Sequence, residues 1–141
     1  MPIAAATSTL ETAIYNALLA PTISSIDYAT QLMSAIASFL AAGQQILPPP
    51  ATPIPVAPTG VPSAVSIYAS SLASNPLKTE ASATALAQAI SLVAPQIPPV
   101  GRSTLQRELS ASLKRSRATE RDTASAWSRA IFNYYSSGGV V

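Results

Sequence analysis

Residues 28 to 43 read YATQLMSAIASFLAAG, and their pattern decides the fold class. Apolar residues recur there at intervals of three and four, which places them on one face of a helix. This helix is expected to begin near Ser24 or Ser25, with Asp27 in its first turn, and to end at Gly43. The stretch therefore predicts an amphipathic helix whose buried face consists of Ala29, Leu32, Met33, Ile36, Phe39 and Leu40.

A second amphipathic helix is expected immediately before the first. Ser8 and Glu11 have the spacing of a capping box, and Pro21 stops the helix after Ala20. Only a few residues around Pro21 separate the two helices, so an antiparallel helical hairpin is predicted over residues 1–46. The larger apolar residues of its first helix are Leu10, Ile14 and Leu18.

A proline-rich linker follows at residues 47–62, LPPPATPIPVAPTGVP, and holds seven of the thirteen prolines. Proline fixes φ and has no backbone donor, so this segment cannot form a helix interior or a central strand. It is expected to lie extended in the polyproline II conformation, as a semi-rigid spacer. The alternative, a ligand for an SH3 or WW groove, lacks a flanking basic residue.

The remainder, residues 63–141, is predicted to be helical. Helices are expected at about 63–73 and 80–94, each ended by proline, and a further helical segment begins at Ser103. Weak helix formers between residues 116 and 123 leave open whether this last segment is one long helix or a pair. No strand is expected, so the sequence predicts an all-α chain of about five helices.

The C-terminal segment combines large aromatic residues with arginines. Trp127, Ile131 and Tyr134 fall on one helical face, and Arg121 and Arg129 lie beside them in the sequence. Trp, Tyr and Arg are enriched among interface hot spots, so these five residues are predicted to form a partner interface. The alternative is that Trp127 fills the chain's own core, which is poor in large side chains.

Positive charge is concentrated in the same half of the chain. Residues 1–77 contain two acidic and no basic residues, whereas residues 78–141 contain eight basic and four acidic ones. On one long helix a basic stripe would form beside the apolar one, from Arg107, Lys114, Arg117 and Arg121. Nucleic-acid binding and membrane-surface binding are the alternative functions that this stripe suggests, but the neighbouring acids weaken both.

Composition argues against catalysis. The chain has no cysteine and no histidine, which removes thiolate chemistry and the commonest metal ligand and general base. Of the six carboxylates only Glu120 and Asp122 are close in sequence, and arginines flank them. We therefore expect no enzyme, no cofactor and no metal. The N-terminus lacks a basic leader before an apolar run, so no signal peptide is predicted, and no window is apolar enough to span a bilayer.

The whole chain resembles minor virion proteins of tailed bacteriophages, such as neck, baseplate or capsid-associated subunits. The features that carry this resemblance are the Ala, Ser, Thr and Pro richness, the short helices separated by prolines, and the basic-aromatic tail ending in SSGGVV. It implies a structural or adaptor subunit in a virion, with other structural proteins as partners; a cytoplasmic location is the alternative. The first two helices are also similar in composition to secreted mycobacterial PE/PPE hairpins, but no Pro-Glu dipeptide opens the chain.

Overall fold

The computed structural model describes residues 6–19, 25–47, 52–55, 58–74, 80–95, 97, 101–113, 119–138 and 140. Six helices and two short strands lie in these ranges. The helices are α1 (Thr7–Leu19), α2 (Ser25–Ala41), α3 (Val61–Ser74), α4 (Glu80–Val93), α5 (Arg102–Leu113) and α6 (Glu120–Ser137). The strands are β1 (Gln44–Leu47) and β2 (Thr52–Pro55). The predicted all-α class is confirmed, and the two short strands are an addition to it.

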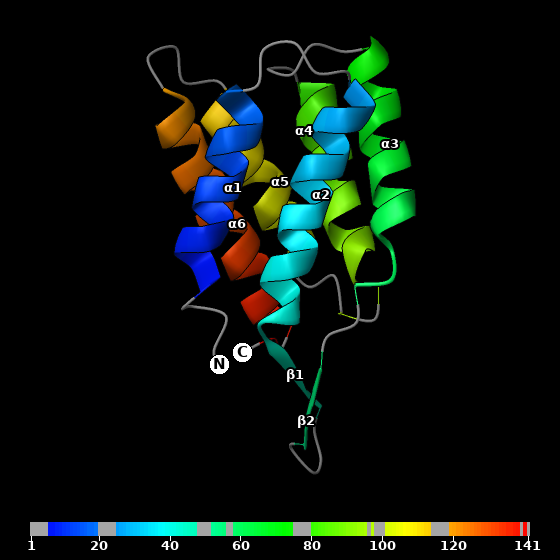
Figure 1. Cartoon of the computed structure of the whole chain (residues 1–141), viewed down its shortest axis with the longest axis vertical. Coiled ribbons are helices and arrows are strands. Elements are labelled where there is room, and N and C mark those ends of the chain that lie inside the picture. The colour runs from blue at the N-terminus through cyan, green and yellow to red at the C-terminus, as the bar shows by residue number, and fades with distance from the viewer. Residues whose placement is uncertain are drawn as a thin grey trace.

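The helices form a closed ring. Each helix packs on the next one along the chain, and α1 packs on α6, which joins the two ends of the helical series. Consecutive helices run in alternate directions, so the start of α1 and the end of α6 lie at the same end of the bundle (Figure 1). α2 also contacts α4 across the interior. The helices of the segment 1–46 and those of 63–141 therefore share one core.

The core contains the residues that the helical periodicity predicts to be buried. All six apolar residues expected on the inner face of α2 are buried, as are Leu10 and Ile14 of α1 and Leu86, Ile90 and Val93 of α4. Alanines from five of the helices occupy the space between these larger residues, which brings the helix axes close together. Because alanine buries little apolar area, the few large side chains carry most of the hydrophobic stabilisation.

The C-terminal segment is a pair of helices, which raises the total from the expected five to six. α6 begins with a capping box, in which the Thr119 side chain accepts from the Asp122 backbone N–H and the Asp122 side chain accepts from that of Thr119. α5 and α6 pack against each other. The apolar stripe that would run along one long helix is therefore folded back on itself, and both halves face the same core.

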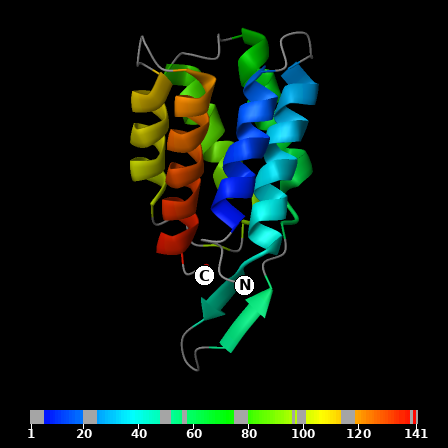
Figure 2. The same cartoon turned by 60° about the vertical axis from the view of Figure 1, so that its left-hand side comes forward.

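Strands β1 and β2 form an antiparallel pair that projects from the end of the bundle (Figure 2). The pairing is Gln44 with Pro55, Gln45 with Ile54, Ile46 with Pro53 and Leu47 with Thr52. The linker was expected to be an extended spacer without strand pairing, and its residues 47 and 52–55 instead join this hairpin. Pro53 and Pro55 are two residues apart, so both occupy positions where a strand needs no donor toward its partner.

The turn before α3 is hydrogen-bonded to the end of α4, near the hairpin. Gly60 donates its backbone N–H to the Val93 carbonyl at 3.0 Å, which joins the start of α3 to the end of α4. A Cβ at Gly60 would lie 1.6 Å from the Leu92 carbonyl oxygen, so no other residue fits there. α3 then starts at Val61, two residues earlier than expected, with Pro62 in its first turn where proline is tolerated.

Candidate functional site

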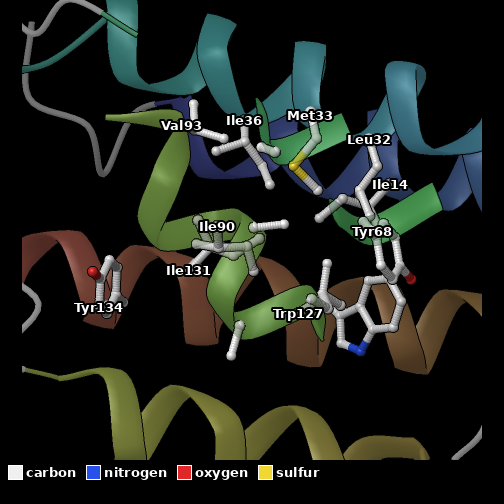
Figure 3. Close-up of a cluster of buried hydrophobic side chains, with 14 of the residues drawn as sticks. Ile14, Leu32, Met33, Ile36, Tyr68, Ile90, Val93, Trp127, Ile131 and Tyr134 are labelled. Atoms are coloured by element: carbon white, nitrogen blue, oxygen red, sulfur yellow. The ribbon is translucent and has the colours of Figure 1, made fainter. Parts of the chain in front are cut away.

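Trp127 is a core residue, not a surface anchor. Its side chain is 1% exposed and points from α6 into the interior shared with α1, α2 and α4 (Figure 3). The indole N–H donates to the Ser112 hydroxyl of α5 at 2.9 Å, and that hydroxyl donates to the Leu109 carbonyl at 2.8 Å. Burial of both the ring and its polar group corrects the partner-interface prediction for this residue and favours the alternative, in which it fills the core.

Ile131 and Tyr134 are buried on the same face of α6. The rings of Tyr134 and Tyr135 pack edge to face with centroids 4.9 Å apart, and the Tyr135 hydroxyl donates to the Ile90 carbonyl of α4. This aromatic pair joins α6 to α4 inside the chain. The partner-interface prediction is therefore corrected for Ile131 and Tyr134 as well. Arg129 lies on the exposed side of α6, away from this face.

A second aromatic contact joins α2 to α3. The hydroxyl oxygens of Tyr28 and Tyr68 lie 3.3 Å apart, and their rings are tilted with centroids 5.8 Å apart. Burial raises the pKa of both phenols well above the ordinary value, and it raises that of Tyr135 as well. The sequence did not predict burial of Tyr68 or Tyr135, because a tyrosine suits a core and a surface equally well.

Arg121 is held by the chain itself at the seam between α1 and α6. Its guanidinium lies 4.1 Å from the centroid of the Tyr15 ring and 3.5 Å from a carboxylate oxygen of Glu11. The Arg121 side chain is 52% exposed, so the ion pair contributes little to stability. The contacts nevertheless orient this arginine along α1, where it is only partly available to a partner.

Arg107 lies on a different side of the bundle from Arg121. It lines a polar hollow between α4 and α5 together with Glu80 and Ser110, and the Ser110 hydroxyl donates to the Glu80 carboxylate. Lys114 and Arg117 lie outside the described residues. The predicted basic stripe assumed one continuous helix, whereas its two described members, Arg107 and Arg121, lie on two different helices, α5 and α6.

A shallow apolar groove runs along α3 beside the start of α2. Ile26 borders it and is 62% exposed, the one large apolar side chain exposed among the residues whose burial the structure describes. The remaining lining residues follow one face of α3 at helical spacing and are Pro62, Val65, Ser66, Ala69, Ser70 and Ala73. Small residues of this kind do not distinguish an outer helix face from an inner one, so no sequence pattern indicated the groove.

Two further features are absent from the part of the chain that the structure describes. No group of three His, Cys, Asp or Glu side chains there could hold a metal ion. No helix among the described residues is long and apolar enough to cross a membrane. Two surfaces of the described chain are candidate sites, namely the projecting hairpin and the α2–α3 groove.

Comparison with known proteins finds no match. No protein-family model matches the sequence, and no curated protein and no solved structure matches it either. The resemblance to minor virion proteins thus remains one of composition and segment order. The function of this chain is therefore indicated only by its own residues and surfaces.

Proposed function

We propose that this chain is a non-catalytic structural or adaptor subunit that connects neighbouring subunits in a larger assembly. A tailed-bacteriophage virion is the proposed setting, and other structural proteins present in multiple copies are the proposed partners. The observation that carries the proposal is the β1–β2 hairpin, which projects beyond a helical ring that is already closed (Figures 1 and 2).

The hairpin contributes little to the fold that it extends from. Each strand has the other strand as its principal neighbour, and neither packs extensively on a described helix. An isolated two-stranded hairpin is only marginally stable in water, because it has no second layer on which to pack. A partner that covered it would supply that layer, which is the behaviour expected of an assembly arm.

The charge distribution supports a protein partner on this side. Residues 28–77 contain no Asp, Glu, Lys or Arg, and they include the hairpin, all of α3 and most of α2. Removing water from an uncharged surface costs little free energy, because no ion has to be desolvated when a neighbour covers it. The α2–α3 groove lies within the same uncharged span and offers a second contact area.

Replacing residues 44–55 with a Gly/Ser segment of equal length is expected to leave the circular-dichroism helix signal of the isolated chain nearly unchanged. The same change should abolish incorporation into the assembly, measured by co-purification with the particle. Asn16→Ser on the exposed side of α1 serves as the control and should incorporate normally. A large loss of helix signal would show that the hairpin belongs to the core, and normal incorporation would refute its role as an arm.

Weak nucleic-acid binding is expected, since the described basic residues do not form a continuous stripe. Arg107 and Arg121 lie on different helices, and Arg121 is paired with Glu11. Few phosphates can then be neutralised together, so the Kd for duplex or single-stranded DNA should be about 10 μM or weaker at physiological salt. Fluorescence anisotropy across a salt series measures this. Submicromolar binding at physiological salt would favour the nucleic-acid alternative.

A further inference from the structure

The two edges of the hairpin differ in what they can bind. In an antiparallel pair, residues alternate between positions that bond to the partner strand and positions whose N–H and C=O point outward. Pro53 and Pro55 have no N–H, so the bonded pairs of this register must be Gln45 with Ile54 and Leu47 with Thr52. The outward positions are then Pro53 and Pro55 on β2, and Gln44 and Ile46 on β1.

The edge of β2 is closed to a further strand, and the edge of β1 is open. At its outward positions β2 offers carbonyl groups without any donor, whereas β1 offers two N–H and two C=O groups. The sheet has only these two strands, so β1 has no second strand beside it among the described residues. Edges of this kind are normally protected by lysine, proline or a bulge, and β1, with the sequence QQIL, contains no charge or proline.

We propose that β1 pairs antiparallel with β1 of a second copy of this chain, about a twofold axis through Gln45. Gln44 of each copy then lies opposite Ile46 of the other, and these pairs exchange four backbone hydrogen bonds. The product is a four-stranded sheet with β2 at each outer edge, where the prolines prevent further growth. This inference rests on the proposed function, since it names the partner of the hairpin and the mode of contact.

The geometry of the hairpin favours a second copy over a strand from another fold. β1 leaves the bundle end and points away from it (Figure 1). Antiparallel pairing therefore places the second bundle at the opposite end of the shared sheet, so the two bundles extend in opposite directions. The absence of charge throughout residues 28–77 means that two identical arms meet without repulsion. An isologous contact also satisfies every outward group of β1 with its own counterpart.

The contact is small, and its strength follows from its size. Four residues from each copy bury far less than the roughly 1,200 Å² that stable interfaces bury, so the Kd of the isolated chain should be on the order of 100 μM. In an assembly that holds many copies close together, the effective concentration exceeds this value and the pairing becomes saturated. The arm would thus join copies only when other contacts have already collected them.

The edge is tested by Ile46→Pro, with Ile46→Val as the matched control. Proline at this outward position removes the donor that the second copy needs and keeps the hydrogen bonds within the hairpin. Each dimer loses two hydrogen bonds, so self-association should weaken about 30-fold. The control should associate like the native chain. Sedimentation velocity between about 10 μM and 1 mM measures both, and circular dichroism should show equal helix content in all three proteins.

The register is tested by placing charge on the proposed axis. Gln45 lies opposite Gln45 of the second copy, so Gln45→Lys and Gln45→Glu should each suppress self-association through like-charge repulsion. An equimolar mixture of the two variants should associate at least as well as the native chain. Failure of the mixture to recover association, while each variant alone is monomeric, would overturn pairing through Gln45.

The failure of this inference is distinguishable from the failure of the proposed function. A native chain that stays monomeric at about 1 mM, or an Ile46→Pro variant that associates like the native chain, would overturn β1–β1 pairing. If incorporation into the assembly still required residues 44–55, the proposed arm would stand with a different partner. If the chain were incorporated without the hairpin while Ile46→Pro still weakened self-association, β1–β1 pairing would be supported. The role of the hairpin as an adaptor would then be refuted.

Discussion

Trp127→Ala is expected to lower the free energy of unfolding by about 3–5 kcal/mol, a large part of the total stability of a chain of this size. The side chain is 1% exposed and has the largest volume among the fully buried residues of the described chain. Its loss would leave a cavity that the surrounding alanines cannot fill. The Ser112 hydroxyl would also lose the indole donor that now lies 2.9 Å away.

Chemical denaturation followed by circular dichroism measures this change. Arg129→Ala on the exposed side of the same helix is the control, and it should alter the midpoint very little. Trp127→Phe should fall between the two, because it keeps most of the apolar volume and loses the hydrogen bond. If Trp127→Ala unfolded like the native chain yet no longer incorporated into the assembly, the core placement of Trp127 would be wrong and the partner-interface prediction restored.

The second large effect is expected at alkaline pH. Burial raises the pKa of Tyr28, Tyr68 and Tyr135 in the folded chain, while in the unfolded chain a tyrosine titrates near 10. Above pH 10 the unfolded state therefore binds fewer protons than the folded state, and stability falls as pH rises. Below pH 10 the phenols are protonated in both states, so they produce no pH dependence there.

The magnitude follows from the number of buried phenols. Tyr28, Tyr68 and Tyr135 each contribute a loss of about 1.4 kcal/mol per pH unit once the pH exceeds 10, so these three together contribute about 4 kcal/mol per unit. Burial also raises the pKa of Tyr134, which adds to the loss. Unfolding near pH 11 should be accompanied by a cooperative rise of tyrosinate absorbance at about 295 nm, because these phenols ionise only when they become exposed.

Tyr135→Phe isolates the effect of one phenol. Whatever it does to stability at neutral pH, it should reduce the slope between pH 10 and 11 by the contribution of one group. Leu86→Val, a buried substitution without a titrating group, should shift the whole stability curve and leave the slope unchanged. Equal slopes for Tyr135→Phe and the native chain would contradict the burial of this hydroxyl.

The sequence was sufficient for the helices and for much of the core. Periodic apolar residues identified the inner face of α2, and Pro21, Pro76 and Pro95 bounded helices whose existence the structure confirms. Local signals of this kind depend only on neighbours along the chain, so they can be recognised without knowledge of the tertiary structure.

Local sequence patterns could not show what packs against each helix face. The aromatic and arginine residues of α6 have the composition of an interface hot spot, but the same residues also suit a core that lacks other large side chains. Which of the two applies depends on α1 covering that face, and the contact of α1 with α6 joins residues as far as 110 positions apart in the sequence. No local pattern contains that information.

The hairpin was missed for a different reason. Proline density was taken to exclude strand pairing, and that rule holds for strands bonded on both sides. In β2 the prolines fall only on alternate positions, and an edge strand needs donors on one side alone. Pro53 and Pro55 occupy alternate positions, so their spacing, unlike their number, is compatible with strand pairing on one side of β2.

Closure of the ring through α1 and α6 sets an order on folding during synthesis. α1 leaves the ribosome before the other five described helices, but α6, one of its two neighbours in the ring, is made after all of them. Helices α2 to α5 can pack on their predecessors as they emerge, whereas the α6-facing side of α1 stays uncovered until α6 has been made. The first helix therefore depends on the last, and a ribosome that stalls before α6 leaves a nascent chain with an open apolar seam.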